Sequence, residues 1–145
     1  IMWIDSDMVF KPEDFFKLLE HDKDIVSGMY KMSDDVNFAT VENMDEKFFE
    51  EWMHYQFMQD KDIEAKKGQL FKADYTGLGW ALVRKGVFEK MKYPYFYPRK
   101  QVWKQYGWEE FVWDDVEFCL RARENGHDIW IDPKIRIGHE KVKIL

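Results

Sequence analysis

The sequence has 145 residues, which suits one domain, and 46% of them are hydrophobic, enough to build a core. The net charge of −6 argues against a basic surface for nucleic acid or anionic lipid. The only cysteine, Cys119, excludes a disulfide framework within the chain, and no apolar run reaches the 18 residues of a membrane span. No signal peptide is visible, so we expect a cytoplasmic protein.

The first thirty residues predict a strand, a helix and a second strand. Residues 1–4 (IMWI) are an apolar run typical of a strand buried on both faces, as parallel strands are. Residues 11–21 predict a helix, because Pro12 suits its first turn and acidic residues follow it. Residues 24–30 (DIVSGMY) predict the second strand. We therefore expect an α/β fold, with a mixed, mostly parallel sheet flanked by helices.

The middle of the chain gives weaker signals. Residues 46–58 predict a helix that could cover a site as a lid or insertion. Residues 70–76 and 79–84 predict two strands around the turn TGLG, and residues 85–91 predict a short helix. Residues 93–99 (YPYFYPR) predict an irregular aromatic and proline loop.

The last third predicts one helix and two closing strands. Residues 114–125 predict the helix, which has acidic residues at its start and ends before Gly126. Residues 128–131 and 134–137 predict the strands, joined by a turn at Asp132–Pro133.

Two aspartates, Asp5 and Asp7, directly follow the first predicted strand. We expect them at the carboxyl edge of the sheet, where α/β folds bind ligands. Two carboxylates there repel one another unless a cation or donors compensate, and a divalent metal shared with a diphosphate is one solution. The alternative is a solvated acidic turn or a pair of helix caps, because this D-x-D pattern alone is a weak signal.

A second acidic cluster opens the helix predicted at 114–125. Asp114, Asp115 and Glu117 place three carboxyls within four residues, more than a helix cap requires. A carboxylate held against the apolar wall of Phe111 and Trp113 could have a raised pKa and act as a general base. An ordinary capped helix start is the alternative.

Two smaller motifs are candidates for ligand contact. His139 follows a strand-like run, and histidine suits Mn²⁺, although a single histidine is more often structural. Gly77 and Gly79 free the backbone for a turn against a ligand, and Trp80 supplies a ring for a sugar face.

The order of these motifs resembles the GT-A fold glycosyltransferases, in particular the family 2-like enzymes that use nucleotide-diphosphate sugars. MWIDSD, LVRK, WDDVEFCLRARENG and the final GH carry this resemblance, which covers essentially the whole chain. The resemblance implies a metal-dependent transfer of a sugar from a nucleotide-diphosphate donor to an acceptor hydroxyl, carbohydrate or other, with inversion. It also implies that residues 1–145 are the C-terminal portion of one GT-A domain, starting at the D-x-D strand and lacking the nucleotide-binding half.

The resemblance also implies a role for each motif residue. Asp5 lies near the ribose and the metal, Asp7 ligates Mn²⁺ or Mg²⁺, and His139 completes the metal site. Asp115 is the catalytic base, and Asp114, in a position that is usually Glu, leaves its acceptor-orienting role open. The implied substrate-binding residues are Asp5, Gly77, Leu78, Gly79, Trp80 and Trp113.

The absent half implies an exposed sheet edge beside residues 1–4, covered by a second copy or a partner. It also implies that this chain alone binds sugar nucleotides weakly or not at all. Two other functions stay open. One is a truncated, non-catalytic remnant or oligomeric interaction module. The other is a HAD-like phosphatase, although DSDMV lacks the Gly of the usual D-x-[DN]-G-[TV] pattern.

Overall fold

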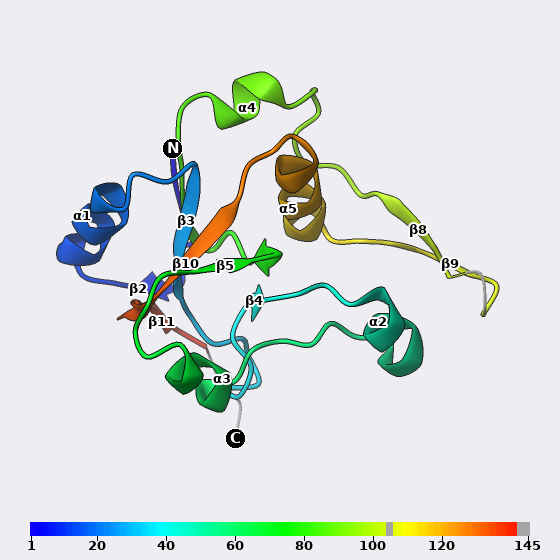
Figure 1. Cartoon of the computed structure of the whole chain (residues 1–145), viewed down its shortest axis with the longest axis horizontal. Helices are drawn as coiled ribbons and strands as arrows, with labels where there is room; N and C mark the ends of the chain where they lie inside the picture. The colour runs from blue at the N-terminus through cyan, green and yellow to red at the C-terminus, as the bar shows by residue number, and fades with distance from the viewer. Residues whose placement is uncertain (104–105, 142–145) are drawn as a thin grey trace.

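The structure, a computed structural model that describes residues 1–103 and 106–141, is a mixed α/β fold built on a five-stranded sheet (Figure 1). The sheet order is β1 (Met2–Ile4), β7 (Trp80–Val83), β3 (Ile25–Met29), β10 (Ile129–Arg136) and β5 (Phe71–Ala73). The helices are α1 (Pro12–Glu20), α2 (Glu46–Trp52), α3 (Asp60–Ala65), α4 (Val87–Lys90) and α5 (Asp114–Glu124). Three two-stranded sheets pair β2 (Met8–Val9) with β11 (Gly138–His139), β4 (Thr40–Val41) with β6 (Tyr75–Thr76), and β8 (Lys100–Trp103) with β9 (Trp108–Phe111).

The sheet is mixed, but the expectation of a mostly parallel sheet is wrong. Only β3 and β10 pair in parallel, whereas the other three neighbouring pairs of the five-stranded sheet are antiparallel. Two of these antiparallel pairs involve β7, which lies between β1 and β3 and runs opposite to both, and the third joins β10 to β5. β1 and β3, which flank α1 in the sequence, therefore point in the same direction, but β7 lies between them in the sheet.

β1 forms the edge of this sheet, so the prediction of a strand buried on both faces is also wrong. Ile4 is 47% exposed and Trp3 36% exposed, because β1 has a single neighbour, β7, among the described residues. The expected exposed sheet edge beside residues 1–4 is present.

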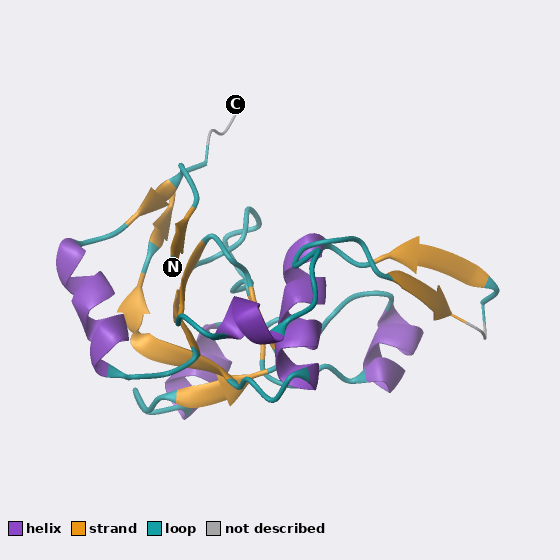
Figure 2. Cartoon of the chain, turned by 90° about the horizontal axis from the view of Figure 1, so that it is seen from above, coloured by secondary structure: helices purple, strands orange, loops and turns teal. Residues whose placement is uncertain are grey.

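The helices cover opposite faces of the sheet (Figure 2). Leu18 of α1 packs with Val26 of β3 and with Trp80, in one cluster of buried residues. Phe118 of α5 packs with Ile25 of β3 in the other cluster. Because adjacent residues of a strand point to opposite faces, Ile25 and Val26 place α5 and α1 on the two sides of the sheet.

Two predicted elements have different bounds in the structure. The helix predicted at residues 46–58 ends at Trp52, because Met53 takes a left-handed backbone conformation with φ of 57°. A separate helix, α3, follows, and the sequence did not predict it. The helix predicted at 114–125 is confirmed as α5.

The two closing strands form one strand, β10, so the predicted turn at Asp132–Pro133 is wrong. The register of β10 against β3 shifts between Ile131 and Arg136, and Pro133, which has no N–H to donate, lies in that irregular stretch. The Asp132 carboxylate accepts the Lys134 N–H at 2.8 Å, which holds the strand locally in place of a sheet bond.

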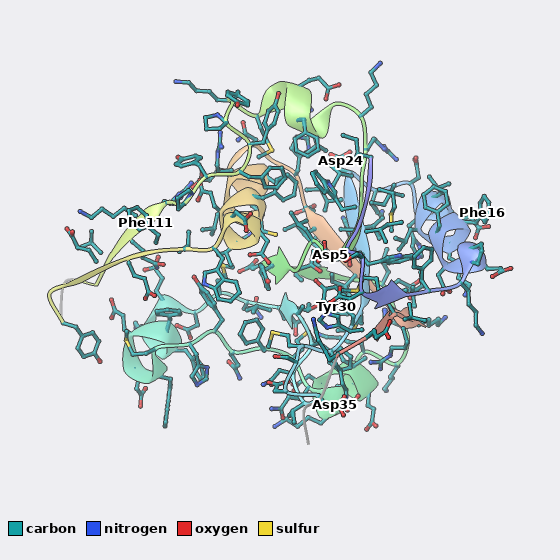
Figure 3. The ribbon with its side chains drawn as sticks, turned by 180° about the vertical axis from the view of Figure 1, so that it is seen from behind. Asp5, Phe16, Asp24, Tyr30, Asp35 and Phe111 are labelled. Atoms are coloured by element: carbon teal, nitrogen blue, oxygen red, sulfur yellow. The ribbon has the colours of Figure 1, made fainter. Side chains whose placement is uncertain are left out.

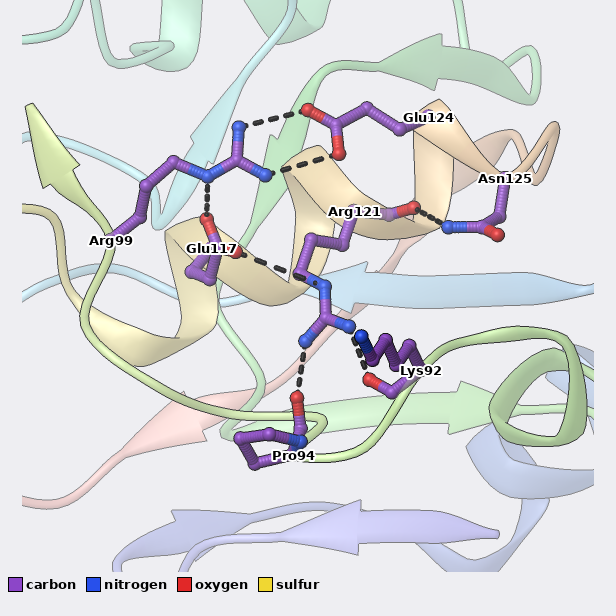
Figure 4. Close-up of polar contacts among 7 residues, drawn as sticks. All are labelled: Lys92, Pro94, Arg99, Glu117, Arg121, Glu124 and Asn125. Carbon is purple, nitrogen blue, oxygen red and sulfur yellow. Dashed lines mark hydrogen bonds and ion pairs between the residues drawn. The ribbon is translucent and has the colours of Figure 1, made fainter.

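An arm made of α2 and the β8–β9 hairpin extends past α5 on one side of the molecule (Figures 1 and 2). The base of the hairpin is fixed to α5 by charged contacts around Glu117, which is completely buried (Figure 4). Arg99 Nε lies 2.6 Å from the Glu117 carboxylate, and the same guanidinium donates two hydrogen bonds to Glu124. Arg121 lies 3.8 Å from Glu117 and donates to the backbone carbonyls of Lys92 and Pro94. These contacts tie the aromatic loop and the hairpin to the helix that carries Asp115.

Over residues 1–103 and 106–141, none of the helices has the length and apolar character that crossing a bilayer demands.

Candidate functional site

The D-x-D loop, the TGLG turn and His139 meet around Tyr30, at the end of β3. Asp5 donates its N–H to the Gly79 carbonyl at 2.8 Å, and Gly79 donates its N–H to the Tyr30 hydroxyl at 3.1 Å. The rings of Tyr30 and His139 meet edge to face, with centroids 5.5 Å apart. Asp5 and Tyr30 lie beside one another near the middle of the molecule (Figure 3). The structure thus brings the motifs of residues 5–7, 77–79 and 139 to one place.

Glycine is required at positions 77 and 79 by close packing around Tyr30. A Cβ on Gly77 would lie 2.1 Å from the Tyr30 hydroxyl oxygen. A Cβ on Gly79 would lie 2.7 Å from Met8 Cε, and 3.0 Å from both the Tyr30 hydroxyl oxygen and the Asp5 carboxylate. The sequence predicted a ligand against these glycines, but side chains take the space, Tyr30 at Gly77 and Met8, Asp5 and Tyr30 at Gly79. Leu78 between them is half-buried and packs against the core.

Trp80 does not offer its ring to a sugar. Its side chain is completely buried, and the ring packs against Phe10 with centroids 5.9 Å apart. The expectation of a sugar-stacking Trp80 is therefore wrong, because the alternation of β7 turns this ring into the core beneath α1.

Asp7 and His139 form a candidate metal-binding pair. His139 Nδ1 lies 2.7 Å from the Lys31 carbonyl, which only accepts hydrogen bonds, so Nδ1 carries the hydrogen. In neutral imidazole the lone pair is then on Nε2, and Nε2 lies 3.2 Å from Asp7 Oδ2. Two lone pairs at this distance repel unless a proton or a cation lies between them. Two ligands of an octahedral Mg²⁺ at right angles lie about 3 Å apart, so this spacing fits a shared metal ion.

Lys141 is a third charged group at this pair. Its Nζ lies 2.8 Å from the same Asp7 oxygen, and this bond is the main reason why the pKa of Asp7 is lowered. Asp5 is not part of the pair, since its carboxylate faces Gly79. Over the described ranges, no three His, Cys, Asp or Glu side chains gather closely enough to hold a metal on their own. A metal at Asp7 and His139 would take its other ligands from water or a bound phosphate.

Asp115, in the first turn of α5, is the second charged centre. Its Oδ2 accepts the Tyr75 hydroxyl at 2.7 Å, and its Oδ1 accepts the Val116 N–H at 2.7 Å. Burial raises the pKa of Asp115 above that of an ordinary aspartate, although the Tyr75 bond opposes the shift. Asp114 is exposed and its carboxylate accepts the Asp115 N–H at 3.0 Å. Asp115 is therefore the carboxylate that fits a general base, and Asp114 orients the backbone beneath it.

Trp113 precedes α5 and is 77% exposed, so its ring is open to a ligand beside Asp115.

Sequence reasoning missed two tyrosines that join these centres. Burial raises the pKa of Tyr30 and Tyr75, so both hydroxyls keep their protons. The charges of both Asp5 and Asp115 also raise the pKa of Tyr30. No local pattern marks either tyrosine, because each acts through a residue at least 40 positions away.

Comparisons with known proteins find a structure with a similar fold but identify no family. No protein-family model matches the chain, and no curated protein matches it either. A solved structure titled "Crystal Structure of A197 from STIV" is similar, with a TM-score of 0.61 and 16% sequence identity. The match covers 97% of this chain and 57% of that chain, so this chain spans little more than half the length of its structural neighbour. At this identity the likeness shows a shared fold alone.

Proposed function

We propose that this chain is the metal-binding and acceptor-activating part of a GT-A-type glycosyltransferase, which transfers a sugar from a nucleotide-diphosphate donor to an acceptor hydroxyl. The observation that carries the proposal is the approach of His139 Nε2 to Asp7 Oδ2 at 3.2 Å, with Nδ1 committed to a backbone carbonyl. A histidine fixed in this way is typical of metal ligands, whose second ring nitrogen is held by an outer partner.

Asp7 and His139 would act on the sugar donor. These residues would hold Mn²⁺ or Mg²⁺, and the ion supplies a positive charge that neutralises the departing diphosphate. Lys141 Nζ already contacts the Asp7 carboxylate at 2.8 Å, so it is a second positive group within reach of the same phosphates.

The acceptor end belongs to Asp115. As the acceptor oxygen forms its bond to the anomeric carbon, the bond from that carbon to the diphosphate oxygen breaks, and Asp115 takes the hydroxyl proton. Tyr75 and the Val116 N–H each hold one carboxylate oxygen, which fixes the direction of the base. The raised pKa of Asp115 makes it a stronger base than an ordinary aspartate. Attack from the side opposite the leaving group inverts the anomeric carbon.

Titration calorimetry with Mn²⁺ tests the metal pair. We expect Asp7→Ala and His139→Ala each to weaken Mn²⁺ binding by at least about tenfold, as loss of a direct ligand should cost no less than loss of an outer-shell partner. Lys141→Ala should tighten binding, because it frees Asp7 from its present cation. Asp128→Ala removes an exposed carboxylate that pairs with Lys72, and it serves as the matched control. Equal affinities of wild type and Asp7→Ala would contradict the metal assignment.

The ion pair with Lys141 favours one other function, a remnant that no longer binds metal. In that case the amine permanently takes the place of the metal, and Lys141→Ala creates no Mn²⁺ affinity. Titration with UDP- and GDP-sugars in the presence of Mn²⁺ tests the related expectation that this chain alone binds sugar nucleotides weakly. Micromolar affinity would contradict that expectation.

A further inference from the structure

A cavity of about 330 Å³ opens between the arm and the start of α5. Its walls come from α2 and the segment that follows it, from the β8–β9 hairpin, and from residues 112–116. Phe111, labelled in Figure 3, lies on the hairpin side. A volume of this size is at the lower end of the range for small-molecule sites, so it suits a molecule of one or two rings.

The walls of this cavity are largely carbon. Ten of its thirteen lining residues are apolar or aromatic, and the three others are His54, Gln101 and Glu110. His54 already bonds the Tyr55 carbonyl through Nδ1 at 2.9 Å. A sugar here would leave several of its hydroxyls without partners, and each unpaired group costs free energy. Aromatic walls instead favour a flat aromatic body.

One end of the cavity is polar. Tyr75 lines it, and the Tyr75 hydroxyl donates to Asp115 Oδ2 at 2.7 Å. Trp113 and Val116, which flank Asp114–Asp115 in the sequence, also line the cavity. A ligand hydroxyl at Tyr75 would lie one hydrogen bond away from the Asp115 carboxylate, which Tyr75 contacts. Glu110 adds a negative charge to the wall and disfavours an anion, while the carbon walls disfavour any unpaired charge, so the ligand should be neutral.

We propose that this cavity binds a neutral aryl alcohol as the sugar acceptor, with its rings between the arm and α5 and its hydroxyl at Tyr75 and Asp115. The catalytic part of this inference rests on the proposed function: the hydroxyl proton passes to Asp115, and the phenolic oxygen forms the glycosidic bond as the donor's bond to diphosphate breaks. The binding part stands on the cavity alone.

Ligand-observed NMR titration with 2-naphthol, without metal or nucleotide, tests the binding part. We expect the wild type to bind 2-naphthol and to bind methyl glucoside far more weakly. Gln101→Trp places a large ring in the cavity and should weaken 2-naphthol binding by at least about tenfold, a loss of about 1.4 kcal/mol. Val102→Trp is the matched control, because Val102 is the next residue of β8, is exposed and does not line the cavity.

Equal binding of 2-naphthol to wild type and Gln101→Trp would overturn the inference, as would tighter binding of methyl glucoside than of 2-naphthol. 2-Methoxynaphthalene, which lacks the hydroxyl hydrogen, should bind more weakly than 2-naphthol, and equal binding would overturn the placement of the hydroxyl at Tyr75 and Asp115. Because no metal is present, failure here leaves the Asp7–His139 assignment untouched. Failure of the Mn²⁺ titration likewise leaves this cavity as a binding site and removes only its catalytic part.

Discussion

A single methyl group at Gly77 tests the packing around Tyr30. In Gly77→Ala the new Cβ meets the Tyr30 hydroxyl at 2.1 Å, and overpacking of this kind costs about 1–3 kcal/mol. Adding Tyr30→Phe removes that oxygen and leaves ring carbon Cζ at 3.1 Å, a far milder contact. Urea denaturation should therefore show the double variant to be more stable than the sum of the two single losses predicts. Additive losses would mean that Tyr30 does not occupy the space at Gly77.

The buried position of Asp115 predicts a pH dependence of stability. Its pKa is raised in the folded state above the ordinary 3.8, so between those two values the native state binds more protons than the unfolded state. The free energy of unfolding therefore falls as pH rises through this window, and the loss is complete once the pH exceeds the pKa of Asp115 in the folded state. Asp115→Asn lacks this titration, so it should gain stability relative to wild type as pH rises. Denaturation from about pH 3 to pH 7 measures the difference, and a difference that is constant with pH would contradict the prediction.

At the scale of elements, the contact between Arg99 and Glu117 holds the hairpin to α5. Arg99→Gln leaves the buried Glu117 with Arg121 alone, at 3.8 Å. We expect a loss of about 1–3 kcal/mol, less than the usual cost of breaking a buried pair because one arginine remains. Glu124→Gln, which removes the exposed partner of Arg99, should cost about 0–1 kcal/mol.

Adding Glu117→Gln to Arg99→Gln separates charge from packing. The double variant removes the unpaired Glu117 carboxylate, and Arg121 keeps its two backbone carbonyl acceptors, so this variant should recover part of the stability lost in Arg99→Gln. Thermal denaturation of wild type, Arg99→Gln, Glu117→Gln and the double variant completes this double-mutant cycle. A double variant less stable than Arg99→Gln would show that the buried charge is not what makes the contact matter.

Elements with complete local signals could be predicted from the sequence, and their arrangement could not. α5 has acidic residues in its first turn and Gly126 after its end, and both act within the helix itself. The place of β7 between β1 and β3 depends on contacts across about 55 to 80 residues, which no local pattern records. The sequence predicts a turn at Pro133 because proline usually interrupts a strand, whereas in β10 a register shift accommodates this residue.

At the candidate site, too, some features can be read from the sequence and others depend on the fold. Asp7, Asp115 and His139 can be proposed from the sequence because their residue types carry chemistry and their order resembles a known family, and their roles stay predictions. The roles of Tyr30 and of the buried Trp80 follow only from three-dimensional packing.

At the scale of the whole molecule, the free edge of β1 predicts self-association or a covering partner. Ile1 and Ile4 are exposed at this edge, and Phe16 and Leu19 are exposed on α1. An edge strand with apolar side chains pairs readily with another chain, and a lysine on it opposes such pairing. Sedimentation velocity should show association that increases with concentration in wild type and decreases in Ile4→Lys. A wild type that is monomeric at every concentration would contradict self-association through this edge.

The location of bound Mn²⁺ tests the central claim most directly, because Mn²⁺ broadens the NMR signals of nearby amides. The account predicts that amides of residues 7–9 and 138–140, which the β2–β11 pairing brings together, broaden first. It also predicts that Asp7→Ala abolishes this broadening. Broadening centred on other acidic surfaces, and unchanged in Asp7→Ala, would contradict a metal site at Asp7 and His139.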